Sequence, residues 1–102
     1  MEIEHWNPTI SGKFSEEKLR QKLETEGYSV TRYVYPPGTM FSDHSHSLDK
    51  KDAVVSGKFR LELEGRSVVL EAGDAIAVPA GIVHRAEVVG TEPVISLDAT
   101  RK

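Results

Sequence analysis

The sequence predicts an all-β, mainly strand-built fold with one short helix near the N-terminus. Eleven Val and five Ile stand against seven Leu and seven Ala, and β-branched apolar residues favour strands. From Tyr28 onward, apolar and polar residues alternate with period two over short segments, as in strands with one buried face. Eight Gly and five Pro separate these segments, as turn residues do. The pattern predicts a sandwich or small barrel of seven or eight strands.

The chain has the length of one domain, with an N-terminal part and a β part. Residues 1–27 are expected to form an arm and a short helix, and residues 28–102 the barrel. Residues 1–13 show no clear period and are expected to be extended. Trp6, the only Trp, is expected to pack on the domain or on a partner subunit.

The helix is expected over residues 15–26. Ser15 is a good N-cap. Phe14 and Leu19 flank it at the spacing of a hydrophobic staple, and Gly27 follows as a terminator. Leu19 and Leu23 give only a narrow apolar stripe, so we expect this helix to pack at the edge of the domain.

The strands are expected between successive turn signals. A Pro-Pro-Gly turn ends the first strand, and single glycines close several of the others. The expected strands cover residues 28–35, 53–55, 59–64, 67–70, 75–78, 82–89 and 93–97.

Composition excludes several classes of function. The absence of cysteine excludes disulfides, thiolate metal sites and cysteine nucleophiles. A net charge of -3 argues against a nucleic-acid-binding face. The longest stretch of low polarity, residues 75–83, is too short and too broken by Pro79 and Gly81 to span a membrane. The acidic N-terminus is unlike a signal peptide, so a cytoplasmic location is expected.

Three of the four histidines are candidates for a metal site. Residues two apart on a strand face the same side, so His44 and His46 can converge on one ion. His84, near the start of another expected strand, is a candidate third ligand. Three His ligands leave coordination positions open for water or substrate. The alternative is a solvated loop, because serines and an aspartate surround the His-x-His triplet.

The turns around these histidines carry a family resemblance. Residues 38–57 read Gly, five residues, His-x-His, three residues, Lys, six residues and Gly. Residues 73–84 read Gly, five residues, Pro-x-Gly, two residues and His. Together they resemble the two-part signature of the cupin superfamily, over about residues 28–98. The resemblance implies a small jelly-roll β-barrel in which one strand supplies His44 and His46, and the second motif supplies His84.

The sequence departs from the family pattern at its carboxylate ligand. Lys50 and Lys51 stand where the family usually has a Glu, and Val88 stands where it often has an Asn. A protonated Lys cannot ligate a cation, so the resemblance supports at most a three-His site for Fe, Zn, Ni or Mn. A carboxylate from Asp43, Asp49 or Asp52 is possible, but no spacing rule places these side chains inward.

The expected ligand is a small anionic molecule. Neutral imidazoles leave a divalent ion its full charge, which favours an anionic oxygen chelator. Lys50 would add a positive charge if it points inward; alternatively, residues 49–52 form a solvated turn. The candidate substrate-binding residues are Lys50, Tyr35, Met40 and Phe41, of which the last three are expected as barrel core before substrate contacts.

Two functions remain open at this stage. One is a metal-dependent enzyme of the kind this barrel supports, such as a dioxygenase or an isomerase. The other is a non-enzymatic small-molecule binding or sensing protein, with or without a metal, which the missing Glu and Asn favour. A homodimer is expected by resemblance, because exposed sheet edges invite pairing.

Overall fold

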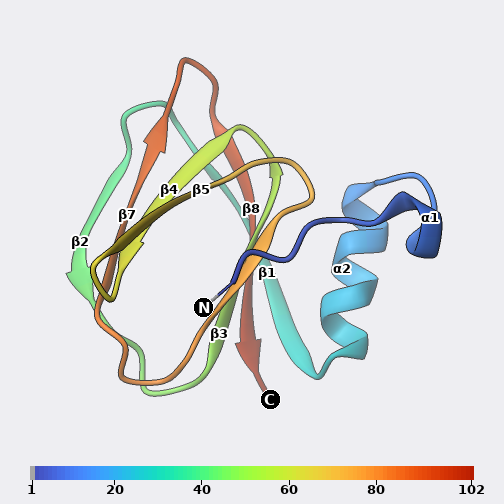
Figure 1. Ribbon diagram of the computed structural model, residues 1–102, viewed down its shortest axis with the longest axis horizontal. Coiled ribbons are helices and arrows are strands. Elements are labelled where there is room, and N and C mark those ends of the chain that lie inside the picture. Colours follow the sequence, from blue (N-terminus) through green and yellow to red (C-terminus); the bar gives the residue numbers. More distant parts are fainter. Residues whose placement is uncertain (1) are drawn as a thin grey trace.

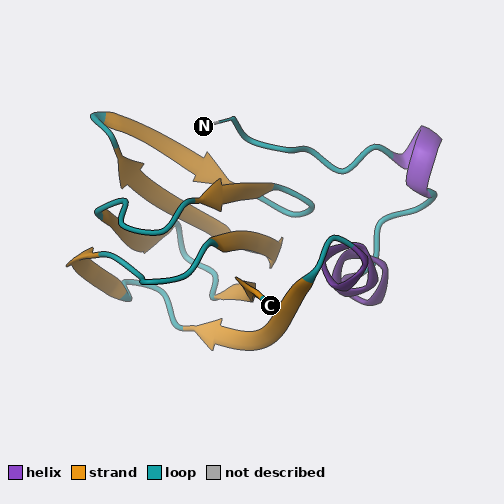
Figure 2. Ribbon diagram, turned by 90° about the horizontal axis from the view of Figure 1, so that it is seen from below, coloured by secondary structure: helices purple, strands orange, loops and turns teal. Residues whose placement is uncertain are grey.

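The computed structural model describes residues 2–102 as two four-stranded antiparallel sheets stacked face to face, with two helices on one side (Figures 1 and 2). The strand order is β1-β8-β3-β6 in the first sheet and β2-β7-β4-β5 in the second. The mainly β prediction is confirmed. The strands are β1 (Tyr28–Tyr35), β2 (Met40–His44), β3 (Lys50–Ser56), β4 (Lys58–Leu63), β5 (Arg66–Leu70), β6 (Ala75–Val78), β7 (His84–Val89) and β8 (Val94–Arg101).

The hydrogen-bonded ladders of these strands lie within each sheet. Within residues 2–102, no ladder joins one sheet to the other, so hydrogen bonds do not close the structure into a barrel. The two sheets are instead joined by a core of alternating apolar side chains, as in other sandwiches. The first sheet contributes Val54, Ile76, Val78 and Val94, and the second contributes Phe59, Leu61, Leu63, Leu70, Ala86 and Val88.

The expected helix is confirmed as α2 (Glu16–Thr25). The hydroxyl of Ser15 accepts a hydrogen bond from the Lys18 N–H at 3.2 Å, which caps the N-terminus. Leu19 and Leu23 are buried in a second core, on the outer side of the first sheet, with Tyr28, Ala53, Ala75, Leu97 and Ala99. None of the helices in residues 2–102 is long and apolar enough to cross a membrane.

The expectation of an extended N-terminal segment is wrong at Pro8–Ser11, which forms the short helix α1. Asn7 caps it by accepting a hydrogen bond from the Thr9 N–H, and proline suits a first turn. Before this helix, Glu4 exchanges backbone hydrogen bonds with Ala75 and so continues the first sheet beyond β6. Met1 lies outside the described residues.

Trp6 packs on its own domain. Its ring meets Phe14 edge to face at 5.4 Å, and its Nε1 donates to the Gly12 carbonyl at 2.8 Å. Gly73 lies beneath it with φ at 87°, and a Cβ there would come within 2.8 Å of the Trp6 Cβ. The glycine therefore allows both the turn and the close approach of the N-terminal segment.

Strand β3 begins three residues before the expected start at Ala53, so the alternative of a solvated turn is wrong at residues 50–52, and only Asp49 lies in an exposed loop. Its residues alternate between the two faces of the sheet. Lys50 and Asp52 share the inner face with Val54, whereas Lys51 shares the outer face with Ala53 beneath α2. Residues 50–52 are polar on both faces of the strand, so no alternation of apolar and polar residues indicates a strand there in the sequence.

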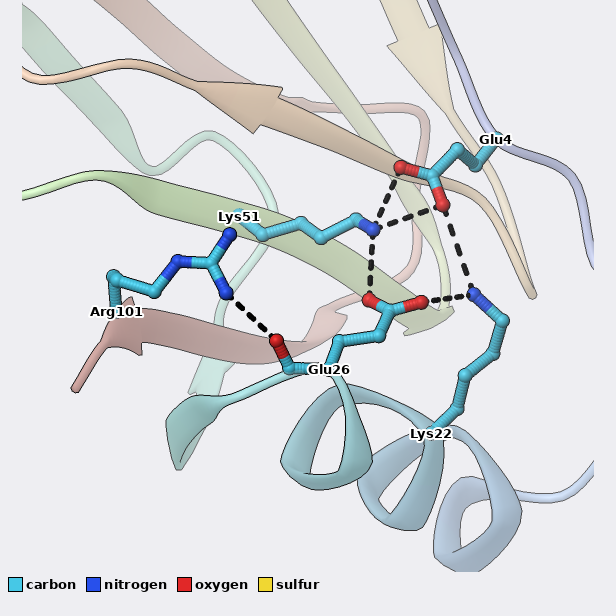
Figure 3. A network of polar contacts seen from close by, with 5 residues as sticks. All are labelled: Glu4, Lys22, Glu26, Lys51 and Arg101. Carbon is cyan, nitrogen blue, oxygen red and sulfur yellow. Dashed lines mark hydrogen bonds and ion pairs between the residues drawn. The ribbon is translucent and has the colours of Figure 1, made fainter.

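Lys51 is 5% exposed and lies at the centre of a charged network (Figure 3). Its Nζ lies 2.6 Å from a carboxylate oxygen of Glu4 and 2.9 Å from one of Glu26, which also pairs with Lys22. Burial alone would raise the pKa of Glu26, but hydrogen bonds from Lys22 and Lys51 outweigh it and hold that pKa below its usual value. The network joins the N-terminal segment and α2 to β3.

Candidate metal centre

His44, His46 and His84 lie together at one end of the second sheet. One ring nitrogen from each is within 4.8 Å of those of the other two. His44 is the last residue of β2 and His84 the first of β7, and the two are direct partners in the ladder. The expectation that one strand carries both His44 and His46 is wrong, because His46 lies in the loop beyond β2.

The loop that carries His46 is tied to the turn before β7. The carbonyl of His46 accepts a hydrogen bond from the Gly81 N–H at 2.9 Å. Oδ1 of Asp49 accepts another from the Ala80 N–H at 2.8 Å. Since the same turn leads into His84, these two bonds fix His46 relative to His84.

Backbone carbonyls set the tautomers of two of the rings. Nδ1 of His44 is 2.7 Å from the Ser42 carbonyl, and Nδ1 of His84 is 2.9 Å from the Ile82 carbonyl. A carbonyl only accepts, so the proton of each neutral ring is at Nδ1 and Nε2 keeps its lone pair. Metal-binding histidines are commonly oriented in this way.

The electrostatics of the site favour neutral imidazoles. Burial lowers the pKa of His46, and the nearby charge of Lys50 lowers it further. Burial also lowers the pKa of His84 and outweighs its hydrogen bond to the Ile82 carbonyl. A metal ligand must be unprotonated, so the donor set fits a divalent transition ion.

The histidines form one wall of a cavity of about 500 Å³ between the two sheets. The first sheet supplies the facing wall, and the residues that line the cavity include no Lys or Arg. Three of the predicted substrate-binding residues, Tyr35, Met40 and Phe41, line it, and Lys50 does not. The full lining is Tyr35, Met40, Phe41, Ser42, His44, His46, Asp52, Phe59, His84, Ala86, Ser96 and Asp98.

Aromatic rings line the apolar part of the cavity. Tyr35 packs edge to face on Phe41 at 5.0 Å and stacks on Phe59 at 5.8 Å. Burial raises the pKa of the Tyr35 phenol to about 12, with further contributions from Asp98 and Asp52. The phenol therefore keeps its proton at neutral pH.

Lys50 points to the inner side of the first sheet, where its charge is already paired. Nζ lies 2.9 Å from Oδ1 of Asp98 and donates a hydrogen bond to Oγ1 of Thr100 at 2.8 Å. Its side chain is 13% exposed. The cation thus lies on the inner face of the sheet beside the cavity lining and holds a carboxylate that lines the cavity.

Two carboxylates of this wall, Asp52 and Asp98, are direct cross-strand partners on β3 and β8. Burial raises the pKa of Asp52 to about 6, and the charge of Asp98 raises it further. Neither belongs to the group of ligand atoms formed by the three histidines. They lie on the wall of the cavity opposite to the histidines.

Sequence reasoning missed Asp98 because it ended the last strand at residue 97, whereas β8 runs to Arg101. The alternation of β8 was a usable signal. Val94 and Ser96 are buried on the inner face, and the same parity places Asp98 there. Val88, where the family often has Asn, is part of the apolar core.

The fold and the site together define a small two-sheet β domain with a three-histidine group at one end of its cavity. The family model described as "Cupin domain" matches residues 31–100. The chain therefore belongs to the cupin family. A comparison with curated proteins finds no match.

Solved structures of similar fold include a conserved protein of unknown function from Streptococcus pyogenes, with a TM-score of 0.66 and 24% identity. KdgF from Halomonas sp. has a TM-score of 0.65 and 25% identity, and a chain from the structures of the DMSP lyases RdDddP and RnDddQII has 0.66 and 28%. Each match covers 74% of this chain. The aligned parts span 65%, 71% and 38% of those three chains, respectively.

Proposed function

We propose that this cupin binds one divalent transition metal ion, Fe, Zn, Ni or Mn, through His44, His46 and His84, and takes a small molecule into the adjoining cavity. The observation that carries the proposal is the clustering of three ring nitrogens within 4.8 Å. Carbonyls that hold Nδ1 of two of these rings support it further, because they leave Nε2 free.

When bound, the metal would supply Lewis acidity and an attachment point for a ligand oxygen. The chain supplies the remaining interactions. Tyr35, Met40 and Phe41 form the apolar contacts of the ligand, and the protonated Tyr35 phenol is a hydrogen-bond donor. Because neutral imidazoles leave the metal charge uncompensated, the ligand is expected to present an anionic oxygen such as a carboxylate.

The activity proposed first is enzymatic, of a metal-dependent type such as a dioxygenase or an isomerase. One of the similar solved structures, at 28% identity, is described as that of DMSP lyases, which are enzymes. The second candidate is a binding or sensing protein without turnover, with or without a metal. Lys50 and Val88 favour it, because neither the usual carboxylate nor the usual amide of the family is present at these positions.

The proposal includes further expectations. The strand orders β1-β8-β3-β6 and β2-β7-β4-β5 support jelly-roll topology. A homodimer remains expected from the family resemblance, although Glu4 of the N-terminal segment lies against the chain's own β6. A cytoplasmic location also remains an expectation from the sequence.

The test is the metal content of untagged protein, measured by elemental analysis after exposure to Fe(II), Zn(II), Ni(II) or Mn(II) and dialysis. We expect close to one metal ion per chain, and strong loss of metal in His84→Ala. His5→Ala is the matched control, because His5 is an exposed histidine that pairs with Asp74 outside the site. Wild-type protein that holds no metal under any of the four conditions would contradict the metal-dependent function. The metal-free binding protein would then be the remaining proposal.

A further inference from the structure

We propose that the cavity selects a small hydroxy acid or amino acid, whose carboxylate faces the three histidines and whose hydroxyl or ammonium group donates to the Asp52–Asp98 wall. The inference rests on the proposed metal function for one end of the ligand. The other end is argued from the facing wall alone.

The first argument is the charge of the cavity. Its lining includes two carboxylates, Asp52 and Asp98, and no Lys or Arg. The nearest cation, Lys50, is already paired with Asp98 and bonded to Thr100. A second anionic group on the ligand would therefore be repelled by these two carboxylates, with no unpaired cation in the lining to offset the repulsion. A hydrogen-bond donor would instead find acceptors in the same two carboxylates.

The second argument is an unused acceptor. Oδ1 of Asp98 is buried and makes no hydrogen bond with the residues the structure describes. Its charged neighbour is Nζ of Lys50, which forms an ion pair with it at 2.9 Å. Asp98 lines the cavity, so a ligand donor that reaches its carboxylate would add a hydrogen bond to the ion pair with Lys50.

The third argument is the arrangement of the two walls. His44 and His84 belong to the second sheet, whereas Asp52 and Asp98 belong to the first. Stacked sheets lie about 10 Å apart, and side chains from both fill much of that space. A ligand of only a few carbon atoms thus suffices to reach from one wall to the other.

The aromatic contacts agree with such a short ligand. Tyr35, Phe41 and Phe59 pack on one another beside the two walls. They offer an apolar surface for a carbon chain between its polar ends, and the phenol of Tyr35 offers one more polar group. An apolar lining with a few placed polar groups is the usual form of a small-molecule site.

The experiment uses four probes that share a carboxylate and two methylene groups and differ only at the far end. 3-Hydroxypropionate carries a hydroxyl there, β-alanine an ammonium, butyrate a methyl and succinate a second carboxylate. Each is titrated into zinc-loaded protein and into metal-free protein, and the dissociation constant is taken from shifts of the cavity amides in nitrogen–proton NMR spectra.

We expect 3-hydroxypropionate and β-alanine to bind about tenfold more tightly than butyrate, and succinate to bind most weakly, because hydrogen bonds to charged groups are the stronger ones. Succinate binding as tightly as 3-hydroxypropionate would overturn the inference. So would a failure of all four probes to shift the cavity amides at tens of millimolar.

Variants separate the wall from the metal. Asp52→Asn should weaken β-alanine more than butyrate, whereas Glu92→Gln, an exposed charge change elsewhere, should leave the ranking intact. Lys50→Met/Asp98→Leu removes both members of an ion pair, and it should reduce the preference for β-alanine over butyrate to within about twofold. An unchanged ranking in both wall variants would contradict the inference.

The two proposals fail in different ways. If zinc does not bind but the ranking persists in the metal-free protein, the metal function is wrong and the donor-selective wall stands. If zinc binds at the histidines and the ranking is absent, the metal function stands and the wall has no such role.

Discussion

Two adjacent lysines of β3 face opposite sides of the same sheet and have different surroundings. Lys51 lies beneath α2 between Glu4 and Glu26, away from the cavity (Figure 3). Lys50 lies on the inner face and pairs with Asp98, a residue of the cavity wall. Both cations are largely buried and paired. Burial of a charged residue therefore does not by itself indicate a role in the site. The face of the strand on which the residue lies decides whether it can reach the cavity.

The largest effect is expected on stability, from replacing Lys51 on the outer face. Lys51→Met removes one of the two cations that Glu4 and Glu26 share and leaves them Lys22, and both carboxylates remain partly solvated. We expect a loss of about 2 kcal/mol in the free energy of unfolding, measured by urea denaturation of metal-free protein. Metal affinity should stay as in wild type. A tenfold loss of metal affinity would show that the outer face also serves the site.

The second effect is expected on zinc affinity, from the loop that carries His46. Asp49→Ala removes the acceptor of the Ala80 N–H and frees the loop that carries His46. We expect zinc affinity to fall by about tenfold, as for other residues that position ligands, measured by competition with a chelator. Asp49→Asn retains an acceptor oxygen and should restore most of the affinity. Equal losses in both variants would mean that the hydrogen bond does not position His46.

The pH dependence of stability should distinguish wild type from Lys51→Met. The pKa of Glu26 is held below its usual value, so its contribution is present above the unfolded pKa and is lost as pH falls through the folded pKa. Burial alone would lower the pKa of Lys51, but its bonds to Glu4 and Glu26 outweigh this and raise it. The contribution of Lys51 is therefore present below its unfolded pKa and is lost as pH rises through the raised folded pKa.

The difference in unfolding free energy between these two proteins should thus be widest between about pH 5 and pH 10 and shrink on both sides. Urea denaturation across this range measures it. A difference that stays constant into strong acid would mean that the network adds no charge-dependent stability.

The smallest effect is expected on the inner face. Lys50→Met removes a positive charge near His46 and His84, which opposes a bound cation. Metal affinity should rise by about threefold, because the charge acts through a partly solvated cavity. Competition with a chelator again gives the affinity. A fall in affinity would instead mean that Lys50 chiefly maintains the shape of the wall.

The sequence was sufficient for features marked by periodicity or by turns. The N-cap at Ser15 and the apolar stripe of Leu19 and Leu23 predicted α2. The glycine and proline turns indicated the family, which the match over residues 31–100 confirms. His44 and His84 could be identified as candidates because their spacing from these turns can be read from a single sequence.

The remainder depends on contacts between distant residues. The run at residues 49–52 resembles a surface turn because it is four charged residues in succession. The partners of its two lysines lie far away in the sequence: Asp98 for Lys50, and Glu4 and Glu26 for Lys51. Asp98 lies 46 positions from its cross-strand partner Asp52 in the numbering, and only the pairing of β3 with β8 brings them together. Such partners carry no local signal.

The central claim is the three-histidine metal centre, and a cobalt titration tests it most directly. Co(II) is added to metal-free protein and its visible d–d absorption is followed. The account predicts bands that saturate at one ion per chain in wild type and in Lys51→Met, and that are largely lost in His84→Ala. Absence of any band in wild type, or saturation unaffected by His84→Ala, would contradict it.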